Sequence, residues 1–174
     1  GDSWTILSGG CRNGNFNACS MINEDTCWFV GTPDAQSNNS IMVTLDGGID
    51  FYEQTNPTQI KLNGVSFINA DQGVAVGNAY TMLFTDDGGD TWDISYDGST
   101  PLNSIYFNDE QNGWAAGITG ELIYTENGGL SWERKDIGTP STLWSISFCN
   151  PLDGIIVGNQ GTAFFTSDGG NTWV

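Results

Sequence analysis

The sequence predicts an all-β protein built from four copies of one structural unit. Glycine makes up 24 of 174 residues and aromatic residues 12%, a composition typical of short strands and tight turns. A segment of the form Thr-x-Asp-Gly-Gly-x-Thr-Trp recurs along the chain, and its aromatic ends lie at Phe51, Trp92, Trp132 and Trp173. The spacings are therefore 41, 40 and 41 residues. No stretch between the glycines shows the apolar period of an amphipathic helix.

Each unit is expected to form four short strands. In the second unit the first strand ends at Phe67, the second spans 73–77, the third spans 82–85, and the fourth starts at Trp92. Turn residues separate these segments every 8–12 positions or so, as in a sheet of short strands. Repeats of about 40 residues with four strands are typical of propeller blades. The sequence thus predicts one β-propeller domain over residues 1–174, with four-stranded blades at about 17–57, 63–98, 103–138 and 144–174.

The two ends of the chain predict how the blades are completed. Residues 3–9 look like a fourth strand without a blade, because residues 1–4 match the end of the repeated segment. The last unit stops at Val174, where its own fourth strand should begin. Three arrangements stay open: a small closed ring, a head-to-tail assembly of copies, or an arc of a longer propeller. An unpaired strand edge is a template for association, which favours the first two.

The repeated segment has the composition of a self-contained turn. Its glycine pair permits positive φ, its Asp or Asn side chain can accept backbone N–H groups, and its Trp can pack over the turn. We expect a structural role, not a catalytic one. The residues assigned to it are Asp46, Asp87, Asn127 and Asp168, with Trp92, Trp132 and Trp173.

These turns resemble the Asp box, or bacterial neuraminidase repeat, of β-propellers. The complete unit is most similar to the photosystem II assembly-factor class of Asp-box propellers, whose relatives are widespread in secreted bacterial proteins. The resemblance implies a scaffold that holds a protein partner. A basic partner-binding patch cannot form from the four cations of this chain, so we expect the architecture and not the photosynthetic role. These cations are Arg12, Lys61, Arg134 and Lys135.

The charge of the chain excludes several function classes. Four Lys and Arg against 21 Asp and Glu give a net charge of −17, which repels nucleic acid and anionic lipid. The absence of His excludes a Ser-His-Asp triad and His-ligated zinc. No apolar run approaches the roughly 20 residues that span a bilayer. We therefore expect neither a nucleic-acid partner nor membrane insertion.

The acidic residues are concentrated in turns that a propeller blade places on one face. Fourteen of the 21 fall there, in the turns between first and second strands and between third and fourth strands. Oxygen-rich clusters suit calcium, and the better candidates are Asp86 with Asp87 and Glu24 with Asp25. The alternatives are a basic partner on this face or simple solvation. No other cofactor is expected.

The cysteines predict an oxidising compartment. Their number is four, at Cys11, Cys19, Cys27 and Cys149, with no CxxC pair that would suggest a thiolate metal site. Their places in the repeat suggest the bonds Cys11–Cys19 and Cys27–Cys149, although three connectivities stay open. The second bond requires blades one and four to be neighbours, since bonded Cα atoms lie within about 7 Å. We expect an extracellular, cell-surface or periplasmic location.

Two enzyme classes share the resemblance and are weighed against a binding role. A site like that of the sialidases would need three arginines, whereas this chain has only two. A β-glucan-cleaving propeller needs two carboxylates and extended loops, whereas loops here are short apart from 32–40. We expect a non-enzymatic structural or interaction module that binds a protein partner or itself, as in a filament or adhesin. The alternative is a glycan-binding or glycoside-hydrolysing propeller, with Trp144 and Tyr96 as stacking residues.

Overall fold

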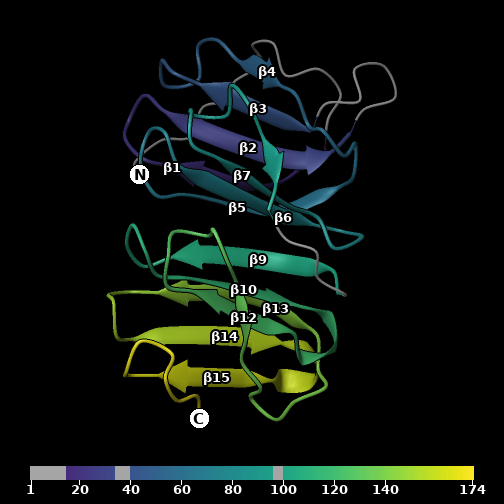
Figure 1. Cartoon of the computed structure of the whole chain (residues 1–174), viewed down its shortest axis with the longest axis vertical. Helices are drawn as coiled ribbons and strands as arrows, with labels where there is room; N and C mark the ends of the chain where they lie inside the picture. The colour runs from purple at the N-terminus through teal and green to yellow at the C-terminus, as the bar shows by residue number, and fades with distance from the viewer. Residues whose placement is uncertain (1–14, 34–39, 96–99) are drawn as a thin grey trace.

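The computed structural model describes residues 15–33, 40–95 and 100–174, and these form four antiparallel sheets (Figure 1). The predicted strand at 3–9 lies outside the described residues. The sheets follow the chain in order. Their strands are β1 (Asn15–Met21), β2 (Cys27–Thr32), β3 (Ile41–Thr44) and β4 (Tyr52–Gln54); β5 (Leu62–Phe67), β6 (Gly73–Gly77), β7 (Met82–Thr85) and β8 (Asp93–Ile94); β9 (Leu102–Phe107), β10 (Gly113–Gly117), β11 (Leu122–Thr125) and β12 (Glu133–Arg134); and β13 (Leu143–Phe148), β14 (Gly154–Gly158) and β15 (Ala163–Thr166).

Every sheet is a meander in which strands adjacent in sequence pair with each other. The register repeats from sheet to sheet. Gly73 lies opposite Phe67 on one side and Thr85 on the other, and Gly113 lies opposite Phe107 and Thr125 in the same way. The only helical elements in the described part of the chain are two short 3₁₀ turns, η1 (Ile118–Gly120) and η2 (Asn159–Gly161). The predicted all-β fold of four repeated blades is confirmed.

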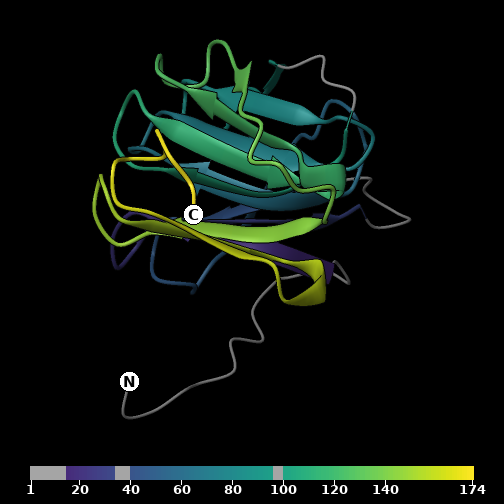
Figure 2. The same ribbon diagram turned by 90° about the horizontal axis from the view of Figure 1, so that it is seen from below.

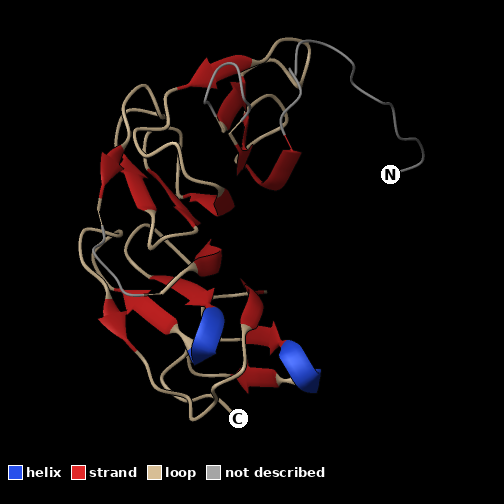
Figure 3. Cartoon of the chain, turned by 90° about the vertical axis from the view of Figure 1, so that its right-hand side faces the viewer, coloured by secondary structure: helices blue, strands red, loops and turns tan. Residues whose placement is uncertain are grey.

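The four sheets stack along an open arc (Figure 3). Contacts join each first strand to the next, from β1 to β5, β5 to β9 and β9 to β13. Seen from below, the C-terminal sheet lies nearest the viewer with the others behind it (Figure 2). The first and fourth sheets lie at opposite ends of the arc (Figure 1). The closed ring, one of the three arrangements left open by the sequence, is therefore not formed by the described residues.

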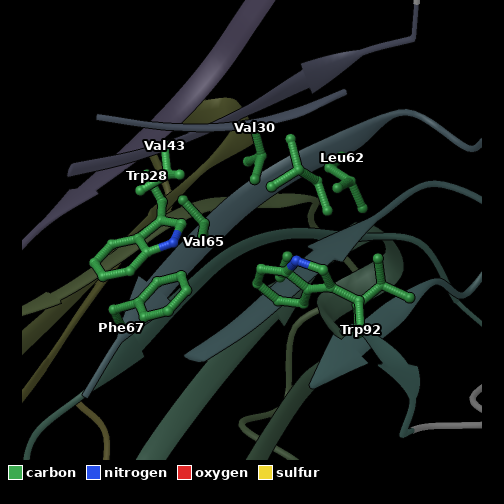
Figure 4. Packing of buried hydrophobic residues seen from close by; sticks show 10 residues of the cluster. Trp28, Val30, Val43, Leu62, Val65, Phe67 and Trp92 are labelled. Atoms are coloured by element: carbon green, nitrogen blue, oxygen red, sulfur yellow. The ribbon is translucent and has the colours of Figure 1, made fainter. Parts of the chain in front are cut away.

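The hydrophobic core lies between sheets. At the first junction, Trp28 of β2 stacks on Phe67 of β5 with ring centroids 3.5 Å apart and an interplanar angle of 9° (Figure 4). Trp92, which precedes β8, meets the same phenyl ring edge-on at 5.8 Å. Aromatic pairs in these geometries add to the free energy gained from buried area. Each junction is thus a small core shared by two consecutive sheets.

The described cysteines are free thiols, so the predicted Cys27–Cys149 bond is not formed. That bond required blades one and four to be neighbours, and they lie at opposite ends of the arc (Figure 1). Cys11 lies outside the described residues. Burial, followed by the neighbouring Cys19 thiol, raises the pKa of Cys27 to about 12. In the described ranges, no helix has the length and apolar character needed to cross a membrane.

Candidate binding face formed by the box turns

The box turns of all four sheets share the hydrogen bonds from the Thr hydroxyl to the Asp or Asn oxygen and from the second Gly N–H to the Thr hydroxyl. In the second sheet, the Thr85 hydroxyl donates to Asp87 Oδ1 at 2.8 Å and accepts from Gly89 N at 2.8 Å. Thr91 donates its backbone N–H and its hydroxyl to the Asp87 carboxylate, at 2.9 and 2.7 Å. Gly88 and Gly89 have φ of 73° and 90°, a region that favours glycine. The turn therefore uses the Thr, the Asp or Asn side chain and the glycine pair together.

The donated bonds lower the pKa of the box carboxylates. The backbone N–H of Thr91 is the first cause at Asp87, and the hydroxyl of Thr172 is the first cause at Asp168. Both carboxylates have a pKa of about 2, against an ordinary value of 3.8. In the third sheet, Asn127 occupies this position and donates from Nδ2 to Ser131 Oγ at 2.8 Å. An amide thus satisfies the same turn without a charge.

Each box turn is hydrogen-bonded to the turn between the first and second strands of its own sheet. Gly88 N donates to Asp71 O at 2.8 Å, and Gly128 N donates to Gln111 O at 2.9 Å. Equivalent bonds at 2.9 Å fix the boxes of the first and fourth sheets. Both sets of turns therefore lie at the same end of every sheet and form one surface, which we call the box face. Its acidic residues in the described ranges are Glu24, Asp25, Asp46, Asp50, Asp71, Asp86, Asp87, Asp90, Asp109, Glu110, Glu126, Asp153 and Asp168.

A hollow opens on the box face at each junction between sheets. Between the second and third sheets, it is lined by Phe84, Glu110 and Glu126. Between the third and fourth sheets, Tyr124 and Glu126 line it together with other residues. Between the first and second sheets, Tyr52 lines it, with Glu53, Asp87 and Asp90. Each hollow therefore combines an aromatic ring with carboxylates.

The walls of these hollows are fixed because each box turn docks on the preceding sheet. Trp28 Nε1 donates to Gly88 O at 3.0 Å, which ties the first sheet to the second box. At the last junction, a Cβ on Gly170 would lie 2.2 Å from the Trp114 ring. Both tryptophans are buried, with 2% and 5% of their surface exposed. Although largely buried, they line the hollows at the first and last junctions.

Among the residues that the structure describes, one cation lies in this acidic surface. Lys135 lines the hollow between the third and fourth sheets and donates from Nζ to Asn171 O at 2.7 Å. Arg134, the next residue back, instead pairs with Glu121 at 3.1 Å. In the same hollow, the Oδ1 atom of Asn108 has no hydrogen-bond partner within the described residues.

The calcium candidates do not form a preassembled site. No group of three or more His, Cys, Asp or Glu side chains with metal-binding geometry occurs in the described part of the chain. The oxygens of Asp87 already accept bonds from its own turn. Asp86, Glu24 and Asp25 are on the box face, where they add to its negative charge.

The hollows and one inter-sheet ladder are features that the sequence reasoning missed. Asn17, Asn63 and Asn103 occupy one repeat position, and each donates from Nδ2 to a backbone carbonyl of the next sheet at 2.7–2.9 Å. Their spacing of 46 and 40 residues could have revealed the ladder. Trp144 takes this position in the fourth sheet and is 55% exposed. Tyr96, its predicted companion, lies outside the described residues.

The fold and its boxes define an Asp-box β-propeller. The family model described as "Photosynthesis system II assembly factor YCF48" matches residues 50–139, which are 90 of the 174 residues. The chain therefore belongs to the YCF48 family. A comparison with curated proteins gave no match.

Solved structures show the same fold at low sequence identity. YCF48 bound to a D1 peptide has a TM-score of 0.60 and 17% identity, over 92% of this chain and 81% of that one. YCF48 from Cyanidioschyzon merolae has a TM-score of 0.73 and 17% identity, over 97% and 56%. The GH74 enzyme of Niastella koreensis has a TM-score of 0.77 and 14% identity, over 91% and 29%. The present chain thus spans only part of the last two.

Proposed function

We propose that this chain is a non-enzymatic, extracellular binding module whose box face holds a Lys- or Arg-rich segment of a partner protein. The observation that carries the proposal is the repeated pairing of an aromatic ring with carboxylates in the hollows. A carboxylate attracts the cationic head of Lys or Arg, and an aromatic ring accommodates the stem and the charge. Hollows at successive junctions suit an extended segment with several cations.

The electrostatics of the box face support a basic partner. Within the described ranges, thirteen acidic side chains lie there against one lysine, whose ammonium group donates to Asn171 O. A surface with one sign of charge raises the rate at which an opposite charge associates, and salt screens that attraction. The YCF48 structure with a bound D1 peptide is a precedent for peptide binding on this fold. The extracellular location is supported by the acidic, Lys-poor composition.

Calorimetric titration with a short oligolysine peptide at low and high salt tests the proposal. Glu110 and Glu126 are exposed and line one hollow, so the pair Glu110→Gln and Glu126→Gln removes charge without touching a box carboxylate. We expect affinity to fall about 3- to 10-fold in the double variant, since exposed pairs contribute roughly 0.2–1 kcal/mol each. Asp93→Asn, at an exposed site on β8, is the matched control. Absence of binding at low salt, or an equal loss in the control, contradicts the proposal.

A second candidate is a glycan-binding or glycan-cleaving role. The fold likeness to GH74 enzymes and the exposed ring of Trp144 favour it. An exposed indole can stack on a sugar ring, and hydrolysis would need two carboxylates on either side of the scissile bond. Titration and hydrolysis assays with xyloglucan separate this candidate from peptide binding. Binding that Trp144→Ala abolishes, together with no response to oligolysine, would favour it.

A further inference from the structure

The three inner junctions bury the same repeat positions. At the second junction, Val74 and Val76 of β6 and Met82 of β7 pack with Ile105 and Phe107 of β9. The three residues of the second sheet are completely buried. A sheet therefore presents its second and third strands to the first strand of the sheet that follows.

The corresponding face of the fourth sheet is uncovered. Ile155 pairs with Phe165 and Val157 with Ala163, so these side chains share one face. Val157 is 39% exposed, whereas Val76 and Ala116, at the same repeat position, are 0% exposed. Phe165 is 55% exposed and lines a largely apolar hollow with Ile155. This outer face keeps the apolar character of an inner junction without its cover.

The asparagine ladder stops at this face. Asn63 donates both to Asn78 Oδ1 in its own sheet, at 3.0 Å, and to Leu102 O in the next, at 2.9 Å. Trp144 replaces the asparagine in the fourth sheet and donates to Asn159 Oδ1 at 2.6 Å. An indole has one N–H, whereas an amide has two. Trp144 therefore satisfies the bond within its own sheet and has no donor for a following sheet of the ordinary repeat.

The first sheet departs from the repeat at the positions that, in the other sheets, contact the preceding sheet. Phe16 lies opposite Gly31 as Leu62 lies opposite Gly77, and Met21 lies opposite Cys27 as Phe67 lies opposite Gly73. In the second sheet, Leu62 is 0% and Phe67 8% exposed, because they face the preceding sheet. Phe16 and Met21 are 36% and 66% exposed. Cys19, between them on this outer face, is also exposed.

We propose that the outer face of the fourth sheet binds the first sheet of a second copy of this chain, head to tail. The contact continues the stacking of the inner junctions, with Val157 and Phe165 against Met21 and Cys19. At the inner junctions, the ladder Asn contacts a Leu of the next sheet. In the proposed contact, Trp144 replaces the Asn and Phe16 replaces the Leu, so both contacting residues differ from the repeat. Apolar burial and aromatic packing supply the affinity. This contact is made by the apolar faces of the strands and not by the box turns, so it does not depend on the proposed peptide binding.

Sedimentation of the full chain over a concentration series tests this assembly. We expect the wild-type mass to rise above the monomer with concentration. Phe165→Asp blocks the fourth sheet and Met21→Asp blocks the first, and each variant alone should stay monomeric. Their mixture should form a one-to-one complex, because one intact copy of each face remains. Ile94→Asp, at an exposed apolar site on β8, is the control and should associate like wild type.

Several results would overturn the assembly. A wild-type chain that is monomeric at every concentration excludes it. A Met21→Asp variant that still self-associates indicates pairing of two fourth sheets. A mixture of the two variants that forms no complex contradicts the head-to-tail contact. Circular dichroism and a thermal melt of each variant establish that the fold is retained. Val157→Asp, on the same outer face as Phe165, is the second variant if Phe165→Asp fails to fold.

Discussion

The inner junctions and the two outer faces of the arc use the same repeat positions in different ways. At the inner junctions, Val76 and Phe67 are buried against the neighbouring sheets. At the outer faces, Val157 and Met21 occupy the same two positions and are exposed. The comparison teaches that a repeat position fixes where a residue lies in its sheet. Whether that residue is buried depends on whether another sheet packs against it. Trp144 and Met21, which depart from the repeat, lie on the two outer faces.

The strongest test of the comparison replaces a buried tryptophan and an exposed tryptophan by alanine. Trp114→Ala should lower the free energy of unfolding by about 3–5 kcal/mol, since a buried ring that contacts Phe148 and Trp173 is lost. Trp144→Ala should change it by less than about 0.5 kcal/mol, as at most exposed sites. Urea unfolding measures both. Similar losses in the two variants would mean that the fourth sheet is covered like the others.

A second test uses the aromatic–glycine pair inside each sheet. A Cβ on Gly113 would lie 2.7 Å from the Phe107 ring, so Gly113→Cys should cost about 1–3 kcal/mol of unfolding free energy. The first sheet carries Met21 and Cys27 at these two positions. Adding Phe107→Met should therefore recover about 1 kcal/mol relative to the sum of the single variants. Strict additivity in the double-mutant cycle would refute this coupling.

The asparagine ladder gives a smaller effect. Asn63→Ala removes bonds to Asn78 Oδ1 and Leu102 O and should cost about 1–2 kcal/mol in chemical denaturation. Trp144→Asn restores the ladder residue on the outer face of the fourth sheet. It should change stability by less than about 0.5 kcal/mol at dilute concentration. Marked stabilisation by this substitution would reveal an acceptor beyond the fourth sheet.

The smallest effect concerns acid stability. Asp87 and Asp168 have folded pKa values of about 2, below the ordinary value of 3.8, so the unfolded chain takes up protons first as pH falls. Their contribution is complete above pH 3.8 or so and is lost toward pH 2. Asp87→Asn should flatten this part of the melting-temperature profile, because an amide serves the same turn at Asn127. An unchanged acid limb would contradict the role assigned to the carboxylate.

The sequence predicted the blades but not how they meet. The glycine pairs and box residues are local, so their period revealed the units and the strands within them. Closure depends on the angle between successive sheets, which no single segment encodes, and the Cys27–Cys149 bond was predicted on a neighbour relation that the arc does not provide. The hollows also escaped prediction. They combine Phe84 of one sheet with Glu110 of the next, which lie in different units of the repeat.

Hydroxyl-radical footprinting of the full chain tests the central contrast most directly. At low concentration, Trp144 and Phe165 should be oxidised rapidly, while Trp28 and Trp114 should be protected. As concentration rises, oxidation of Trp144, Phe165 and Met21 should fall together, because the two outer faces cover each other. Protection of Trp144 and Phe165 equal to that of Trp114 in the dilute chain would contradict the account, since the outer face of the fourth sheet would then be covered by residues of the same chain.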